Sequence, residues 1–129
     1  MAVTKKKNFH ILLVDDNKFL VEIYQRQLEK KGYKVTVTFD GEQALEVLSK
    51  VEVDLLLLDI MMPKLNGFDV LEEIQKRPKL KKLFIIVHSS LGHEKDIAKA
   101  KKLGANDYMI KTQVTTQEII SRIENSLSK

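Results

Sequence analysis

Three aspartates stand directly after two apolar runs of the chain. Asp15 and Asp16 follow the run 10–14, and Asp59 follows the run 54–58. If these runs lie side by side, the three carboxylates repel one another unless a cation lies among them. Oxygen ligands without His or Cys favour a hard cation, Mg²⁺ or alternatively Mn²⁺. One such acid alone is more simply explained as a turn residue or helix cap, but three together favour a metal site.

A hydroxyl and an ammonium follow two later apolar runs. Ser89 and Ser90 come after the run 83–88, and Lys111 comes after the run 107–110. Facing a cluster of carboxylates and a metal ion, such groups suit a tetrahedral anion, and a phosphoryl group is the natural candidate. A loop serine or a surface lysine means little by itself, so the prediction depends on their joint placement.

Other phosphate chemistries lack their motifs in this sequence. A glycine-rich loop ending in Gly-Lys-Ser/Thr is absent, and so is GxGxxG after the first apolar run, which argues against nucleotide binding. Hydrolases that form an aspartyl-phosphate usually carry a second acid two residues after the nucleophile, where this chain has Met61. With no general base for turnover, the pattern predicts a site that accepts a phosphoryl group and keeps it.

The elements that must position these residues alternate along the chain. Short runs rich in Leu, Ile and Val predict strands that helices cover on both faces, and the stretches between them have helical periodicity. The predicted strands are 10–14, 35–39, 54–58, 83–88 and 107–110. The predicted helix ends are set by capping boxes at Asp40 with Gln43 and Thr115 with Glu118, by a cap at Asn66, and by stops at Gly32 and Gly104.

This alternation predicts an α/β fold with a parallel sheet and right-handed crossovers. A closed eight-fold barrel needs about 250 residues, so a chain of 129 is too short for one. The expected fold is therefore a flavodoxin-like, doubly wound five-stranded sheet of strand order 2-1-3-4-5, with helices on both faces. Functional groups of such sheets gather beyond the carboxyl ends of the strands, where the acids, the serines and Lys111 fall.

Composition restricts the other classes of function. The chain has no cysteine, so disulfides and thiolate metal sites are excluded, and no apolar run approaches the ~20 residues that cross a bilayer. The apolar segment 9–14 is too short for a signal-peptide core, so we expect a cytoplasmic protein without membrane insertion. The net charge is +4, but the lysines, including Lys5–Lys7 and the dense group Lys79, Lys81 and Lys82, are interleaved with other residues and lack alternating aromatics. We therefore expect no direct nucleic-acid binding.

The chain resembles response-regulator receiver domains of two-component signalling, the chemotaxis-regulator type, over residues 9–127. The matching segments are ILLVDDN at 11–17, DLLLLDIMMPKLNG at 54–67, FIIVHSS at 84–90 and GANDYMIK at 104–111. The pattern DxMMPxxxG after an apolar strand is highly specific, and its combination with an Asp-Asp pair and a later Lys leaves little room for chance. We expect residues 1–129 to form one receiver domain.

The resemblance implies a role for each residue of the site. Asp59 would accept a phosphoryl group from a histidine kinase or a histidine phosphotransfer protein. Asp15 and Asp16 would hold Mg²⁺ together with Asp59 and the backbone carbonyl of Met61, and Lys111 would contact the phosphoryl oxygens. Such a domain is a phosphoacceptor regulator that catalyses only its own phosphoryl transfer and slow dephosphorylation.

The resemblance also implies how the signal leaves the site. Ser89 matches the family's switch hydroxyl, and Tyr108 matches the aromatic residue that swings inward when this hydroxyl moves. Pro63 and Gly67 fit the loop that follows the phosphorylation site. The altered surface would lie on the fourth helix, fifth strand and fifth helix, where it would dock a downstream protein.

The sequence departs from the family at two positions, and it is apolar at two of the family's variable positions. Thr112 replaces the usual Pro after Lys111, and because a cis peptide before a non-proline residue costs ~3 kcal/mol, we expect a trans peptide here. Ser90 replaces the usual Ala or Gly. Met61 and Leu91 are apolar where polar side chains would help to orient an attacking water, which predicts slow autodephosphorylation. His88 and His93 are expected to be structural or exposed rather than metal ligands.

Three other functions remain as alternatives to a phosphorylation switch. A pseudo-receiver would keep the fold without switching, which only the Thr112 departure favours. A small metal-dependent phosphohydrolase would need a base for turnover. Direct binding of nucleic acid would show a steep salt dependence. Met1 and the end of the last helix near the C-terminus favour a stand-alone regulator over one piece of a longer protein.

Overall fold

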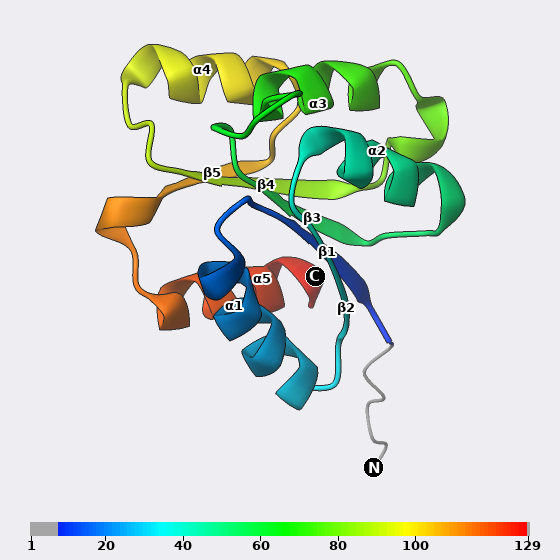
Figure 1. Cartoon of the computed structure of the whole chain (residues 1–129), viewed down its shortest axis with the longest axis vertical. Coiled ribbons are helices and arrows are strands. Elements are labelled where there is room, and N and C mark those ends of the chain that lie inside the picture. The colour runs from blue at the N-terminus through cyan, green and yellow to red at the C-terminus, as the bar shows by residue number, and fades with distance from the viewer. Residues whose placement is uncertain (1–7, 129) are drawn as a thin grey trace.

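The computed structural model describes residues 8–128, so the predicted basic group Lys5–Lys7 lies outside the described residues. Five parallel strands form one sheet in the order β2-β1-β3-β4-β5, which confirms the predicted order and fold class (Figure 1). The strands are β1 (His10–Val14), β2 (Lys34–Thr38), β3 (Leu55–Leu58), β4 (Phe84–Ser89) and β5 (Asp107–Ile110).

Five helices cover the two faces of this sheet. They are α1 (Lys18–Lys30), α2 (Gly41–Lys50), α3 (Gly67–Gln75), α4 (Glu94–Lys102) and α5 (Thr116–Leu127), with short 3-10 turns at η1 (Pro78–Leu80) and η2 (Lys111–Gln113). Figure 1 shows α2, α3 and α4 on one face and α1 and α5 on the other. No helix of residues 8–128 is long and apolar enough to cross a membrane.

The core is divided by the sheet into two layers. Alternate residues of β1 contribute side chains to the two layers, because successive side chains of a strand point to opposite faces. Leu12 and Val14 join the cluster under α2, α3 and α4, whereas Ile11 and Leu13 join the cluster under α1 and α5. All four are almost completely buried, as are the four leucines of β3. Burial on both faces explains why β1 and β3 lack polar alternation.

Two of the three predicted N-terminal caps form as expected, and one differs. Thr115 and Glu118 make a reciprocal capping box, and Asn66 caps α3 and shares a full box with Asp69. Asp40 accepts a hydrogen bond from the backbone of Gln43, but the Gln43 side chain accepts from the backbone N–H of Phe39 instead of Asp40. The capping box predicted for Asp40 and Gln43 is therefore wrong in one of its two hydrogen bonds, because the Gln43 side chain is already bonded to the N–H of Phe39.

Five strand boundaries differ from the prediction by one residue: both ends of β2, the start of β3 and both ends of β4. β2 runs from Lys34 rather than Val35, because His10 of β1 pairs with Lys34. Ser89 is the last residue of β4, paired with Ile110, and does not follow the strand as predicted. Asp54 precedes β3, where its side chain accepts a hydrogen bond from the backbone N–H of His10 at 2.8 Å.

Candidate functional site

The parallel register brings the first and third strand ends together. Val14 pairs with Leu58, and the backbone N–H of Asp59 donates to the carbonyl of Val14 at 3.0 Å. Asp15, Asp16 and Asp59 each offer a carboxylate oxygen within 4.8 Å of the others. Asp15 and Asp59 are buried, whereas Asp16 is exposed and opens the cluster to solvent. The predicted convergence of the three acids is confirmed.

Lys111 supplies the positive charge of this cluster. It begins the 3-10 turn after β5, and its Nζ lies 2.8 Å from Asp15 Oδ2 and 3.2 Å from Asp59 Oδ2. No peptide bond of residues 8–128 is cis, so Lys111 reaches the acids with a trans bond to Thr112, as predicted. The missing proline therefore does not keep the ammonium from the site.

Hydrogen bonds from backbone N–H groups two residues further along the chain orient both buried carboxylates. The backbone N–H of Asn17 donates to Asp15 Oδ1 at 2.9 Å, and the backbone N–H of Met61 donates to Asp59 Oδ1 at 3.3 Å. Each carboxylate thus has one oxygen held by its own loop and the other by Lys111. The Met61 backbone faces Asp59 through this N–H, and its carbonyl as a metal ligand stays a prediction.

The surroundings of Asp59 raise its pKa. Burial, and then the negative charge of Asp15, raise the pKa of Asp59 to about 6, although Lys111 and the Met61 N–H pull it down. Burial opposes the charge on Lys111, but its hydrogen bond to Asp15 and the charges of both acids outweigh burial and raise its pKa. Lys111 therefore stays protonated at neutral pH, whereas Asp59 loses its proton only as the pH passes about 6.

The donor atoms of the cluster fit a hard divalent cation. They are carboxylate oxygens at mutual distances that one ion can bridge, and no Cys or His belongs to the group found among the described residues. Three carboxylates carry more negative charge than the single ammonium of Lys111 can neutralise. A divalent cation beside Asp16, the exposed acid of the three, would neutralise the remaining negative charge of the carboxylates.

Ser89 and Tyr108 are tied to one another through the backbone of Leu91. The fully buried hydroxyl of Ser89 accepts a hydrogen bond from the Leu91 N–H at 3.2 Å. The hydroxyl of Tyr108 donates to the Leu91 carbonyl at 2.7 Å. Any movement of the Ser89 hydroxyl therefore disturbs the residue that holds Tyr108. The sequence resemblance predicted a switch role for both residues, but not this connection between them.

The loop after β3 closes over the site through a close backbone approach. A Cβ added to Gly67 would lie 2.5 Å from the carbonyl oxygen of Asp59 and 2.7 Å from the Cα of Ile60. The backbone N–H of Gly67 also donates to the carbonyl of Ile60 at 2.8 Å. Only glycine fits here, so the start of α3 is held directly against the loop that follows β3.

An apolar groove borders the acids on the outside. It has a volume of about 490 Å³ and is lined by Asp16 together with Met61, Pro63, Phe68 and Leu91, among others. The side chain of Met61 is 56% exposed in this groove. Met61 and Leu91, whose apolar character led to the prediction of slow autodephosphorylation, therefore line one groove together with the exposed Asp16.

The histidines behave as structural or exposed residues. His88 is buried on β4 and packs against Tyr24 with ring centroids 5.6 Å apart, and burial, reinforced by Lys111, lowers its pKa to about 4. It is therefore neutral behind the site. His93 is exposed at the start of α4 and makes no side-chain cap. The structure bears out the expectation for both.

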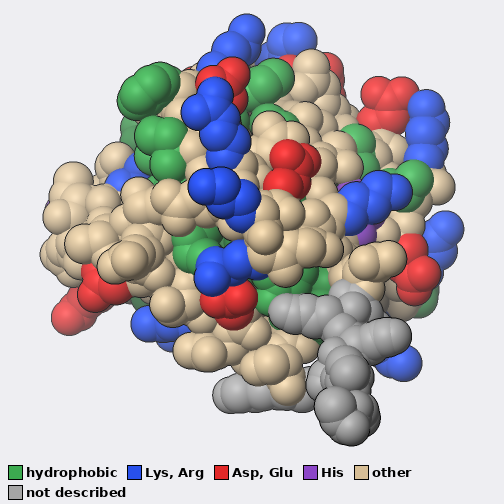
Figure 2. Space-filling model, turned by 90° about the horizontal axis from the view of Figure 1, so that it is seen from below, with side chains coloured by type: hydrophobic (Ala, Val, Ile, Leu, Met, Phe, Trp, Pro, Cys, Tyr) green, Lys and Arg blue, Asp and Glu red, His purple; other side chains and the backbone are tan. Residues whose placement is uncertain are grey.

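The basic residues are spread over the surface. Figure 2 views the molecule from the side of α1 and α5, where several Lys and Arg side chains lie in a line and others lie beside acidic ones (Figure 2). Several cations are paired within the described chain, as in the ion pairs of Lys31 with Glu124 and Arg122 with Asp107.

Known proteins resemble this chain over most of its length. Residues 11–124 match the family described as the response regulator receiver domain. The response regulator SaeR of Staphylococcus aureus (strain USA300) is 42% identical over 120 residues, which cover 93% of this chain and 51% of SaeR. The chain thus spans about half the length of the curated relatives it matches.

Solved structures agree with this match. The receiver domain of the Francisella response regulator 1452 superposes with a TM-score of 0.85 at 28% identity, covering 94% of this chain and 98% of the other. The non-phosphorylated HemR receiver domain from Leptospira biflexa gives a TM-score of 0.85 at 28% identity, covering 94% and 95%. Phosphorylation switching is the general function of this signalling family. The chain belongs to the response-regulator receiver domain family.

Proposed function

We propose that Asp59 is the residue of this receiver domain that accepts the phosphoryl group. The observation that carries the proposal is the buried Asp59 carboxylate, which shares Lys111 with Asp15 at 3.2 and 2.8 Å. The donor is a phosphohistidine of a histidine kinase or a histidine phosphotransfer protein. The phosphorus–nitrogen bond breaks as a phosphorus–oxygen bond to Asp59 forms, and the imidazole ring leaves.

The residues around Asp59 align the reaction and balance its charge. The Met61 N–H holds Asp59 Oδ1, so the carboxylate keeps one orientation while it attacks. Lys111 donates a hydrogen bond to Asp59 Oδ2, and on phosphorylation it would bond a phosphoryl oxygen in place of this one. The raised pKa of Lys111 keeps it cationic. Mg²⁺ held by Asp15, Asp16, Asp59 and the Met61 carbonyl would neutralise phosphoryl oxygens, and Mn²⁺ would serve in the same way.

The signal leaves the site through Ser89 and Tyr108. A phosphoryl group on Asp59 offers new acceptor oxygens to the Ser89 hydroxyl, which at present accepts from Leu91. If Ser89 turns toward the phosphoryl group, the Leu91 backbone and its bond to Tyr108 must readjust. The readjusted surface is the α4-β5-α5 face, where a downstream protein docks.

The remaining features of the proposal concern the whole domain. Residues 1–129 form one receiver domain with a core of about 9–127, located in the cytoplasm, without direct nucleic-acid binding or membrane insertion. It is not an enzyme toward other substrates, since it catalyses only its own phosphorylation and a slow autodephosphorylation. The apolar Met61 and Leu91 beside Asp16 support the slow step, because neither can orient a water molecule.

Intact mass after incubation with acetyl phosphate, with and without Mg²⁺, tests the proposal. We expect one phosphoryl adduct that requires Mg²⁺, disappears in Asp59→Asn and persists in the matched control Asp96→Asn on α4. If the folded, Mg²⁺-binding protein forms no adduct even with a phosphorylated histidine donor, the chain is a pseudo-receiver. Repeated release of phosphate from a model ester would instead identify a phosphohydrolase.

A further inference from the structure

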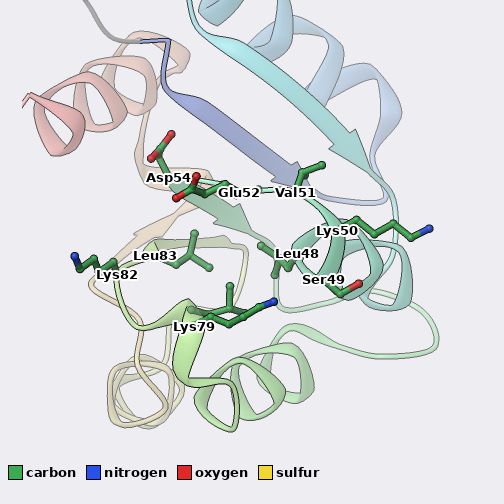
Figure 3. Close-up of a pocket in the computed structure, with 11 residues that line it drawn as sticks. Leu48, Ser49, Lys50, Val51, Glu52, Asp54, Lys79, Lys82 and Leu83 are labelled. Carbon is green, nitrogen blue, oxygen red and sulfur yellow. The ribbon is translucent and has the colours of Figure 1, made fainter.

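A hollow lies at the amino end of the sheet, opposite the phosphorylation site. It has a volume of about 430 Å³ and is formed by the end of α2, the loop into β3, η1 and the loop into β4 (Figure 3). Asp15 and Asp59 follow the carboxyl ends of β1 and β3, whereas this hollow borders the residues that precede β3 and β4. A molecule bound here would leave the phosphorylation site uncovered.

The hollow has an apolar lining that reaches the surface. Leu48 and Leu83 are buried at its base, and Leu80 is partly buried. Val51 is 46% exposed, one of three large hydrophobic side chains that are exposed among the described residues. Figure 3 shows Leu48 and Leu83 between the lysine of η1 and the acids before β3. The lining therefore offers contact surface for an aliphatic side chain.

Two lysines at this hollow lack a partner. Lys79 and Lys82 are exposed and make no side-chain ion pair or hydrogen bond with the described residues. Three other basic residues near the hollow are paired, because Lys50 pairs with Glu46, and Lys76 and Arg77 both pair with Glu73. Lys81 is exposed and unpaired within the described chain as well but does not line the hollow, so Lys79 and Lys82 are the unpaired cations beside the apolar lining.

The hollow continues into a second one, so the binding surface is elongated. The second hollow has a volume of about 320 Å³ and shares Leu48, Ser49, Lys79 and Leu80 with the first. We call the two together the amino-end trough. Lys79 therefore lies where the two parts meet, and Figure 3 shows its side chain directed toward Leu48 and Ser49. An extended segment suits this shape better than a compact ligand.

The acids of the trough discriminate between negatively charged partners. Glu52 and Asp54 line the side away from Lys79, and the Asp54 carboxylate is held by the His10 N–H. A nucleic-acid backbone carries a charge at every phosphate and would meet these acids, and no aromatic side chain lines the trough to stack a base. A peptide can instead place single carboxylates at the lysines and uncharged residues at the acids.

We propose that the amino-end trough binds a short acidic, leucine-containing segment of a protein partner. Its carboxylates would meet Lys79 and Lys82, and an aliphatic side chain would pack on Leu48, Leu80 and Leu83. The receiver domain would then have a docking surface separate from both the phosphorylation site and the α4-β5-α5 face.

The test measures binding of a fluorescein-labelled, blocked peptide that carries a few glutamates and leucines among uncharged residues by anisotropy, with amide chemical shifts to locate it. We expect shifts concentrated at Ser49, Val51 and residues 79–83. The double variant Lys79→Glu, Lys82→Glu should weaken binding roughly tenfold or more. The matched double variant Lys95→Glu, Lys101→Glu changes the net charge equally on exposed residues of α4 and should leave the affinity within about twofold.

Further peptides separate the two kinds of contact. Replacing the leucines by glycine should weaken binding, because the apolar lining then loses its partner. Phosphorylation by acetyl phosphate should be unchanged in the Lys79, Lys82 variant, which shows that it is folded. Equal weakening in both charge variants, shifts centred on another surface, or tighter binding of single-stranded nucleic acid than of the peptide would each overturn the proposal.

Discussion

The two ends of the sheet carry lysines in opposite circumstances. At the carboxyl end, Lys111 is mostly buried and bonds two carboxylates that are themselves held by backbone N–H groups. At the amino end, Lys79 and Lys82 are exposed and have no side-chain partner among residues 8–128. A buried charge must be paired, whereas an exposed one is already solvated and is available to a partner. The same residue type is therefore part of the site in one place and a free contact in the other.

The largest expected effect is on stability, and it differs between Gly67 near the carboxyl end of the sheet and Gly104 near the amino end. Gly67→Ala should lower the free energy of unfolding by about 3 kcal/mol, since the new Cβ would meet the Asp59 carbonyl at 2.5 Å. Gly104→Ala, before β5, has no atom closer than 3.7 Å and should cost about 1 kcal/mol through its φ of +110° alone. Urea unfolding measures both. Equal costs would show that the close approach at Gly67 is not a constraint.

The second effect compares the lysines directly. Lys111→Met should lower the free energy of unfolding by about 2 kcal/mol, because Asp15 and Asp59 lose their shared cation in a largely buried place. It should also abolish phosphorylation by acetyl phosphate. Lys82→Met should change stability by less than about 0.5 kcal/mol, as is usual for unpaired surface residues. Thermal unfolding of the two variants at one pH measures both changes in stability. Similar losses in the two variants would contradict the difference between a buried, paired lysine and an exposed, unpaired one.

The third effect is a pH dependence confined to the carboxyl end. In the folded protein the pKa of Asp59 is raised from 3.8 to about 6, chiefly by burial and then by Asp15. The folded state therefore holds this proton between pH 4 and 6 more tightly than the unfolded state does. The free energy of unfolding then falls as the pH rises through this window, and the loss is complete above it.

Asp59→Asn removes this dependence. Relative to the variant, the wild type should lose on the order of 1–2 kcal/mol of stability between pH 4 and pH 7 in EDTA. Adding Mg²⁺ at pH 7 should reduce the difference, because a bound cation favours the carboxylate. Stability curves of wild type and variant that run parallel over this range would contradict the raised pKa. Lys82→Met should leave the wild-type pH profile unchanged.

The smallest expected effect concerns the apolar groove beside Asp16. Met61→Asn with Leu91→Glu should speed loss of the phosphoryl group about tenfold, because polar side chains can orient the attacking water. The decay of the phosphorylated mass over time measures it. The control is the Lys79→Glu, Lys82→Glu variant at the other end, whose decay should match the wild type. Unchanged decay in the groove variant would disprove the predicted role of Met61 and Leu91.

Much of the fold could be predicted because its signals are local. The apolar runs identified all five strands to within one residue, and the order 2-1-3-4-5 followed from chain length and the rules of parallel sheets. The errors arose where neighbouring segments compete for a bond. The Gln43 side chain bonds the Phe39 N–H, and Ser89 extends β4 because Ile110 pairs with it.

The candidate site was predicted in its members but not in its connections. Asp15, Asp59 and Lys111 follow strand ends, and parallel strands bring such ends together. Nothing local indicates that Lys111 bridges two carboxylates or that Leu91 bonds both Ser89 and Tyr108. His88 gave no signal of its place behind the site, because an apolar strand buries whichever residue stands at that position.

The sequence by itself therefore determined the alternation of strands and helices, the residues at the strand ends and the family. These depend on periodicity and on short motifs, which are properties of neighbouring residues. Only the tertiary structure decided which charges are paired, how far the pKa of Asp59 rises, and that the end of α2 and η1 enclose a trough beside two unpaired lysines. Pairing and burial depend on segments far apart in the chain, whose contacts exist only once the sheet has formed.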